Sequence, residues 1–143
     1  KRMKAMTDTK RRQFLATAGA LASLSALPAS AQANPRASAE LPPILHMVYF
    51  WLKDPASTED KQKLIDGLQS LRAIPQVHSL HIGVPANTLK RDVIDNSFDV
   101  SELMFFESVE AQDEYQLHPI HKKFIEDCAH LWREVVVRDS ISV

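Results

Sequence analysis

The chain has 143 residues, of which 45% are hydrophobic, with 17 basic and 18 acidic side chains and a formal net charge of −1. Residues 1–33 contain six of the basic side chains and one of the acidic ones, so residues 34–143 carry 11 basic and 17 acidic side chains and a formal charge of −6. A domain this acidic excludes binding of nucleic acid or anionic membrane through a basic surface, and its length allows one compact domain rather than two.

Residues 1–33 follow the three-part pattern of a secretory signal. A basic beginning leads into an uncharged run from Phe14 to Leu27, followed by two overlapping candidate cleavage sites, Ala29-Ser30-Ala31 and Ala31-Gln32-Ala33. The pair Arg11-Arg12 resembles a twin-arginine signal, which exports folded bacterial proteins, with the general export route as the alternative. A membrane anchor is a further alternative, but the uncharged run is short for a membrane span. We expect cleavage, export to the bacterial periplasm and no stable membrane association afterwards.

The first predicted strand runs from Leu45 to Lys53, after a proline-containing linker over residues 34–43. The period of two in a strand divides its side chains between two faces. One face carries His46, Val48, Phe50 and Leu52, and the other carries Met47, Tyr49 and Trp51. Both faces are largely apolar, so we expect both to be covered.

A helix is predicted next, with Ser57 or Thr58 as its N-cap and acidic residues in its first turn. Its apolar residues recur at helical spacing and end before Pro75. The stripe consists of Leu64, Leu68 and Leu71, with Ile65 beside it.

Two further strands are predicted from Val77 to Val84 and from Phe98 to Glu107. Residues 85–97 between them are polar and form a long loop of the kind that often borders a site. His78 and His81 differ by an odd number in the second strand, so they point to opposite faces and form a polar edge rather than a ligand pair.

The last elements are a short helix from Val109 to Leu117, a longer helix from Pro119 to about Glu134, and a strand from Val135 to Ile141. The order β-α-β-β-α-β predicts an α+β protomer with the ferredoxin-like split arrangement. Helices on one face of such a sheet leave the face with Tyr49 and Trp51 bare, which predicts a homodimer paired through its sheets.

The segment from Tyr115 to His121 is the strongest candidate for chemistry. It holds a phenol and two imidazoles, Tyr115, His118 and His121, around a helix break at Pro119. These groups hold, donate or accept protons near neutral pH. In one continuous helix a spacing of six would put Tyr115 and His121 on different faces, whereas the break can turn them toward one cavity. Capping or packing of the histidines is the alternative.

The residues around this segment resemble the stress-responsive dimeric α/β-barrel (Dabb) family. The resemblance covers roughly residues 44–143 and is carried by three stretches: His46 to Phe50, Phe106 to Ala111, and Tyr115-x-x-His118-Pro119-x-His121 with Phe124. It implies a ferredoxin-like protomer that pairs through its sheets into a barrel.

Within this family, plant olivetolic acid cyclase closes a linear polyketide by an aldol condensation without a cofactor. The resemblance implies that Tyr115 and His121 occupy its catalytic positions and that His46 corresponds to a histidine near its pocket. The chain departs in the third strand, where the cyclase has a pocket histidine and this sequence has Val100 or a neighbour.

We therefore expect an exported domain that binds a small organic ligand and carries out cofactor-free acid–base chemistry, cyclase-like or lyase-like, on a ketonic or aromatic compound. His121 would remove a proton alpha to a carbonyl while Tyr115 hydrogen-bonds the carbonyl oxygen. The expected substrate-binding residues are His46, Val48, Phe50 and His118. The alternative is a non-catalytic, stress-related dimer that binds a small apolar ligand.

The histidines and the single cysteine raise the questions of a metal site and a disulfide. A metal site would use the nitrogens of His46, His118 and His121, but two of them flank a proline and no acidic ligand is spaced with them, so no metal and no other cofactor is expected. The single cysteine, Cys128, excludes an intrachain disulfide. It is expected to be a buried helix residue, with a reactive or bridging thiol as the alternative.

Overall fold

The computed structural model describes residues 40–143. The predicted signal peptide over residues 1–33, and most of the predicted linker, lie outside these residues. None of the helices within residues 40–143 has the length and apolar character needed to cross a membrane.

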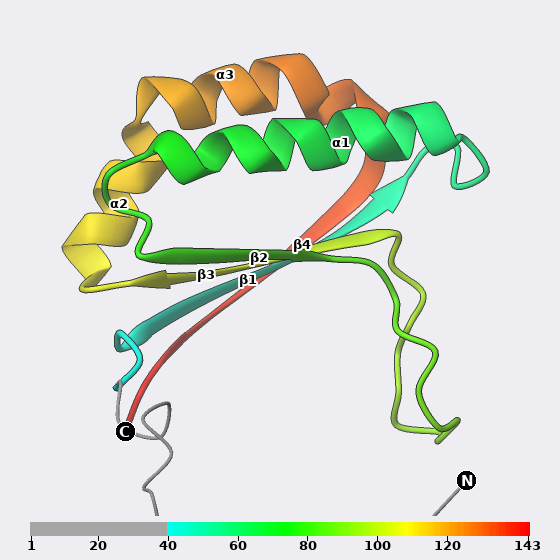
Figure 1. The fold of residues 1–143 in the computed structure, drawn as a ribbon, viewed down its shortest axis with the longest axis horizontal. Helices are drawn as coiled ribbons and strands as arrows, with labels where there is room; N and C mark the ends of the chain where they lie inside the picture. Colours follow the sequence, from blue (N-terminus) through cyan, green and yellow to red (C-terminus); the bar gives the residue numbers. More distant parts are fainter. Residues whose placement is uncertain (1–39) are drawn as a thin grey trace, which may run out of the picture. The chain divides into compact units, whose positions relative to one another are not determined.

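The described residues form a four-stranded antiparallel sheet with its helices on one face (Figure 1). The strands lie in the order β2-β3-β1-β4. The elements are β1 (Ile44–Leu52), α1 (Thr58–Ser70), η1 (Leu71–Ala73), β2 (Ser79–Gly83), β3 (Val100–Phe106), α2 (Val109–Leu117), α3 (Pro119–Cys128), η2 (Ala129–Leu131) and β4 (Trp132–Ile141). This is the predicted ferredoxin-like α+β fold.

The alternation predicted for β1 is present. Ile44, His46, Val48, Phe50 and Leu52 are buried toward the helices, whereas the residues between them are only partly buried on the other face. Residues directly opposite each other in antiparallel strands share a face. The side chains that join this helix-facing surface from the neighbouring strands are Val100, Glu102, Met104 and Phe106 of β3 and Val135, Val137, Asp139 and Ile141 of β4.

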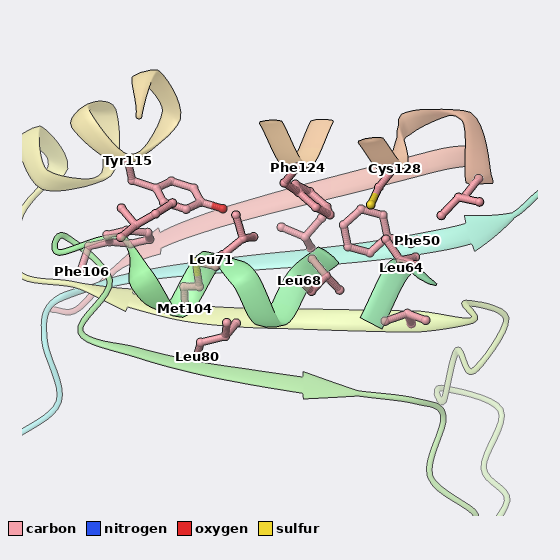
Figure 2. Close-up of a cluster of buried hydrophobic side chains, with 14 of the residues drawn as sticks. Phe50, Leu64, Leu68, Leu71, Leu80, Met104, Phe106, Tyr115, Phe124 and Cys128 are labelled. Atoms are coloured by element: carbon pink, nitrogen blue, oxygen red, sulfur yellow. The ribbon is translucent and has the colours of Figure 1, made fainter. Parts of the chain in front are cut away.

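The core lies between this surface and the helices. Leu64 and Leu68 of α1 and Leu71 of η1 are completely buried where these helices face the sheet, as the predicted stripe requires (Figure 2). The N-cap of α1 is Ser57, whose hydroxyl accepts a hydrogen bond from the backbone N–H of Asp60 at 3.1 Å. Burial of a leucine side chain contributes on the order of 2 kcal/mol, so these residues anchor the helix layer.

The helix predicted to reach about Glu134 ends at Cys128, and the last strand begins at Trp132 rather than Val135. Pairing with β1 explains the difference. Trp132 lies opposite Leu52, and its ring packs against Phe50 with centroids 5.1 Å apart. The extended backbone gains ladder hydrogen bonds and this aromatic contact, which together override a weak local helix preference.

The other strand boundaries differ by one or two residues, because β2 covers Ser79–Gly83 and β3 covers Val100–Phe106. The loop between them extends away from the sheet (Figure 1). Its end is fastened to β1 by Asp99, whose backbone N–H donates to the carbonyl of Phe50 and whose carboxylate accepts from the N–H of Leu52, both at 2.8 Å.

Candidate active site

The chain breaks between α2 and α3 at His118, which ends one helix and begins the next. The backbone N–H of His118 donates to the carbonyl of Tyr115 at 3.1 Å, and the His118 ring accepts from the N–H of Ile120 at 3.1 Å. Pro119 takes the first helical position, where its missing N–H costs nothing. The break brings the Tyr115 and His121 rings together, with centroids 4.7 Å apart.

Tyr115 and His121 line a cavity of about 200 Å³ between α2, α3 and the β1–β4 side of the sheet. Its polar residues are His46, Glu102, Gln116 and Asp139, and its apolar wall is formed by Val48, Phe50, Phe124, Ile125, Trp132, Val135 and Val137. The cavity is open toward β4, because Val135 and Val137 face it and remain 42% and 49% exposed. A mostly apolar pocket with a few converging polar groups is the usual form of a small-molecule site.

The His121 ring is held by the backbone. Its Nδ1 lies 3.2 Å from the carbonyl oxygen of Gln116. A carbonyl only accepts hydrogen bonds, so Nδ1 carries the proton and Nε2 keeps its lone pair. Partial burial lowers the pKa of His121, the Gln116 carbonyl opposes that shift, and the nearby His46 adds to it. His121 is therefore a neutral imidazole near pH 7, which is the form of a general base.

Tyr115 and Glu102 form a buried pair. The Tyr115 hydroxyl lies 3.4 Å from Oε1 of Glu102, and the two residues are 1% and 2% exposed. Burial raises the pKa of the Glu102 carboxyl to about 7, although the tyrosine hydrogen bond lowers it slightly. Burial raises the pKa of Tyr115 well above its ordinary value, and the adjacent Glu102 raises it further. Glu102 is therefore substantially protonated at neutral pH.

His46 belongs to a third polar group. Its Nδ1 lies 2.6 Å from Oδ1 of Asp139 on β4, and the side-chain amide of Gln112 donates to the same carboxylate oxygen at 3.0 Å. A carboxylate only accepts hydrogen bonds, so the contact with Asp139 places a proton on Nδ1 and fixes the orientation of the ring. The His46 and Tyr115 rings meet edge to face, with centroids 6.0 Å apart.

The structure gathers five of the six predicted site residues around the cavity: His46, Val48, Phe50, Tyr115 and His121. Their catalytic and binding roles remain predictions. The sixth, His118, does not line the cavity, because its ring is engaged in capping α3.

Sequence reasoning missed Glu102, Asp139 and Gln112. The sequence around Glu102 contained a usable signal, because this acid lies at the centre of an apolar strand and shares the parity of Met104, which faces the core. Asp139 and Gln112 carried none, since their approach to His46 depends on the register of β4 and on the placement of α2.

Other candidate residues lie elsewhere. Within residues 40–143 no three His, Cys, Asp or Glu side chains are arranged to hold a metal ion. His81 is exposed on β2, and His78 precedes it with its Nε2 3.8 Å from a Glu107 carboxylate oxygen. Cys128 is buried, and burial raises the pKa of its thiol. These positions agree with the polar edge and the buried helix residue expected from the sequence.

The described residues form a ferredoxin-like domain with a cavity lined by Tyr115 and His121. The family described as "Stress responsive A/B Barrel Domain" (Dabb) matches residues 44–142, so the chain belongs to the Dabb family. No curated protein matches the chain significantly in sequence.

Several solved structures are similar. A Dabb protein with a ferredoxin-like fold from Mesorhizobium loti is 26% identical, with a TM-score of 0.56 over 70% of this chain and 96% of that one. A dimeric ferredoxin-like protein of Thermobifida fusca is 19% identical, with a TM-score of 0.56 over 69% and 90% of the two chains. A hydroxynitrile lyase from Passiflora edulis is 19% identical, with a TM-score of 0.61 over 73% and 96%. The last two show the fold alone.

Proposed function

We propose that this Dabb domain catalyses cofactor-free proton transfer on a small ketonic or aromatic compound. The observation that carries the proposal is that the rings of Tyr115 and His121 lie together in a largely apolar cavity, with their centroids 4.7 Å apart. His121 is a neutral base with a fixed tautomer, and Tyr115 is a neutral hydrogen-bond donor whose ionisation the site disfavours. The same positions are implied by the resemblance to olivetolic acid cyclase.

The chemistry follows from these two groups. Nε2 of His121 removes a proton from a carbon next to a carbonyl, and the Tyr115 hydroxyl donates a hydrogen bond to the oxygen on which negative charge develops. His46, oriented by Asp139, supplies a second imidazole to the bound compound. An enol or enolate formed in this way can close a ring or release a leaving group, which accommodates cyclase-like and lyase-like reactions. The Passiflora neighbour supports only the compatibility of the fold with a lyase.

The substrate is a small uncharged compound. A cavity of about 200 Å³ is smaller than a drug-sized pocket, so it suits one ring or a short chain. The described residues that line it include two carboxyl groups and no Lys or Arg, so nothing in that lining favours an anion.

Deuterium exchange of the methyl protons of acetophenone in D2O, followed by proton NMR, tests the proposal with a neutral aryl ketone. We expect the wild-type domain to catalyse this exchange. His121→Ala should lower the exchange rate about 100-fold. His81→Ala is the matched control, because His81 is an exposed histidine on β2 outside the cavity. The proposal fails if the two variants exchange at the same rate while both retain a wild-type melting temperature.

The second candidate function is non-catalytic binding of a small apolar ligand by a stress-related protein. The apolar wall of the cavity favours it, with Phe124 and Trp132 packed at 5.9 Å between ring centroids. Trp51 and Trp132 are the two tryptophans of the chain, so Trp51→Phe leaves Trp132 as the fluorescent reporter of the cavity. Quenching by acetophenone without proton exchange would select this function.

We also propose that the domain is a homodimer paired through the bare face of the sheet. Partly buried apolar side chains cover that face, including Met47, Tyr49, Trp51, Leu103 and Phe105. The Thermobifida fusca neighbour is described as dimeric. Tyr49→Glu is expected to give a monomer in sedimentation velocity. Leu117→Glu is the control and should leave the dimer intact, because Leu117 is an exposed residue of α2, away from that face of the sheet.

Export of the domain by the segment 1–33 is a further proposal, supported by its basic start, uncharged run and small-residue cleavage sites. Expression of the full chain in a bacterium and mass spectrometry of the periplasmic fraction test it. A mature N-terminus within residues 30–36 is expected, and Arg11→Lys with Arg12→Lys should retain the protein inside the cell if the twin-arginine route is used.

A further inference from the structure

Glu102 is an acid where the packing calls for an apolar residue. It projects from β3 into the core between Val100 and Met104, which share its face and are 0% exposed. Its carboxyl reaches the cavity lining, and its Oε1 accepts one hydrogen bond, at 3.4 Å, from the Tyr115 hydroxyl. A protonated Glu102 also has an O–H that can donate to the phenol oxygen once the Tyr115 hydroxyl turns toward a bound compound.

A purely structural role does not account for this residue. Burying a carboxyl group costs several kcal/mol when it is charged, and a long hydrogen bond recovers only a fraction of that cost. The side chain that contacts its carboxyl is Tyr115 from α2, and His46, His121 and Asp139 line the same cavity. The described residues that line the cavity include no Lys or Arg, so no permanently charged cation there offsets the burial of an ionised Glu102, and burial favours its protonated form.

We propose that Glu102 is a positioning residue that holds a proton in reserve behind Tyr115 and returns it to the phenol oxygen when Tyr115 gives up its own. The inference rests on the proposed function of Tyr115 and His121. It identifies the acid side of the reaction as a pair of residues rather than as Tyr115 alone.

The proton movements balance. His121 Nε2 takes a proton from the carbon, the electrons of that C–H bond form a carbon–carbon double bond, and the carbonyl π electrons move to oxygen. The Tyr115 proton passes to that oxygen, and the Glu102 proton passes to the Tyr115 oxygen. The products are an enol, a protonated His121, a neutral Tyr115 and an ionised Glu102. The reverse transfers restore the starting state.

The electrostatics of the site support this division of work. Tyr115 alone is a poor proton source, because its surroundings raise the pKa of the phenol far above its ordinary value. The pKa of Glu102 is about 7, so a proton is present at neutral pH and is released more readily than that of the tyrosine. Proton transfer is most effective when the pKa of the donor lies near the working pH.

The acetophenone exchange assay separates this inference from the proposed function. Glu102→Gln keeps the size of the side chain and a hydrogen-bond donor to Tyr115 but holds no transferable proton. We expect it to lower the exchange rate at least about 10-fold. We expect the wild-type rate to fall as pH rises past about 7, where Glu102 loses its proton, and we expect Glu102→Gln to lack that fall. In a Tyr115→Phe background, Glu102→Gln should have no further effect, because Glu102 acts through Tyr115.

Each outcome decides one question. Loss of exchange in His121→Ala with an unchanged rate and pH profile in Glu102→Gln overturns the Glu102 inference and leaves the proposed function standing. A lower rate in Glu102→Gln with the alkaline fall retained assigns Glu102 to packing and also overturns it. If Glu102→Gln does not fold, Glu102→Asp replaces it and is expected to keep the alkaline fall at a reduced rate; loss of that fall overturns the inference.

A substrate-independent measurement completes the test. Carbon-13 NMR of the wild-type domain is expected to show the Glu102 carboxyl titrating near pH 7, with the ring carbon that bears the Tyr115 hydroxyl shifting over the same range. Titration at an ordinary carboxyl pH, or a Tyr115 signal that does not respond, overturns the pairing even if acetophenone is not a substrate.

Discussion

The space between the helices and the sheet is filled differently under α1 than under α2 and α3. Under α1 and η1 it is filled by leucines, and Leu64, Leu68 and Leu71 are completely buried (Figure 2). Under α2 and α3 it holds the cavity, with Tyr115 and Glu102 buried at its edge. The space under α1 is filled by apolar side chains, whereas the space under α2 and α3 combines polar groups with unfilled volume.

The difference follows from how far the helices extend over the sheet. The helix-facing valines of β4, Val135 and Val137, are about half exposed, whereas Val100 on β3 is completely buried. Close packing of a core needs atoms on both sides. Where the outer strand runs past the helix layer, no helix side chains fill the space, and polar residues there remain within reach of solvent and ligand.

The largest expected effect lies on the filled side. Leu68→Ala removes a fully buried side chain and should lower the free energy of unfolding by about 2–5 kcal/mol. Val137→Ala is the control from the open side and should cost less than about 1 kcal/mol, because its side chain is 49% exposed. Urea unfolding measures both, and equal losses would contradict the contrast between the two sides.

Glu102→Gln sharpens the contrast through pH. The pKa of Glu102 rises from 4.5 to about 7 on folding, so between these values the folded state holds a proton that the unfolded chain has lost. Wild-type stability should therefore fall as pH rises through this window, by about 3 kcal/mol for this group, and the variant should lack that fall.

Urea unfolding at about pH 5 and pH 8 gives the measurement. The free energy of unfolding of the variant, relative to that of the wild type, should be higher at about pH 8 than at about pH 5. An identical pH dependence in the two proteins would show that folding does not raise the pKa of Glu102.

Gly67→Ala tests how tightly α1 packs against α3. An added Cβ would lie 2.5 Å from the Cys128 sulfur and 3.1 Å from Phe124. Overpacking of this kind costs about 1–3 kcal/mol, against a gain of up to about 1 kcal/mol in helix propensity. Combination with Cys128→Ala should relieve the overlap, so that the cost of Gly67→Ala is smaller in that background. Strictly additive costs would show that α1 and α3 separate freely.

The smallest effect concerns His121. Its pKa is lowered by burial, so its imidazole should titrate below 6.5 in the folded domain. The unfolded chain takes up a proton at 6.5 before the folded state does, so His121 makes a small negative contribution to stability as pH falls below that value. NMR titration of the ring protons checks the direction, with His81 as the exposed reference. A midpoint above 6.5 would contradict the burial of His121 at the cavity.

Local patterns were sufficient to predict most of the fold. The parity of β1, the stripe of α1 and the bounds of α2 at Val109–Leu117 follow from periods and capping residues within a single segment. The early end of α3 at Cys128 did not follow, because the strand at Trp132 is stabilised by a β1 residue eighty positions away in the sequence, Leu52.

The site was predictable to the extent that one segment contains it. Tyr115 and His121 share a break that the proline makes visible. The partners that set their chemistry come from other strands, as Glu102 does on β3 and Asp139 on β4. Which carboxyl meets which ring is decided by strand register, and no local pattern contains that information.

Gln116 performs two separate tasks. The residue lines the cavity, and its backbone carbonyl holds His121 in one tautomer. Substitutions at this position exchange the side chain but leave the carbonyl in place. Residue 116 can therefore vary through evolution, or in a mutant library, to accept different ligands without disturbing the base. The path of the main chain makes the chemistry robust to mutation at a position where selectivity is free to change.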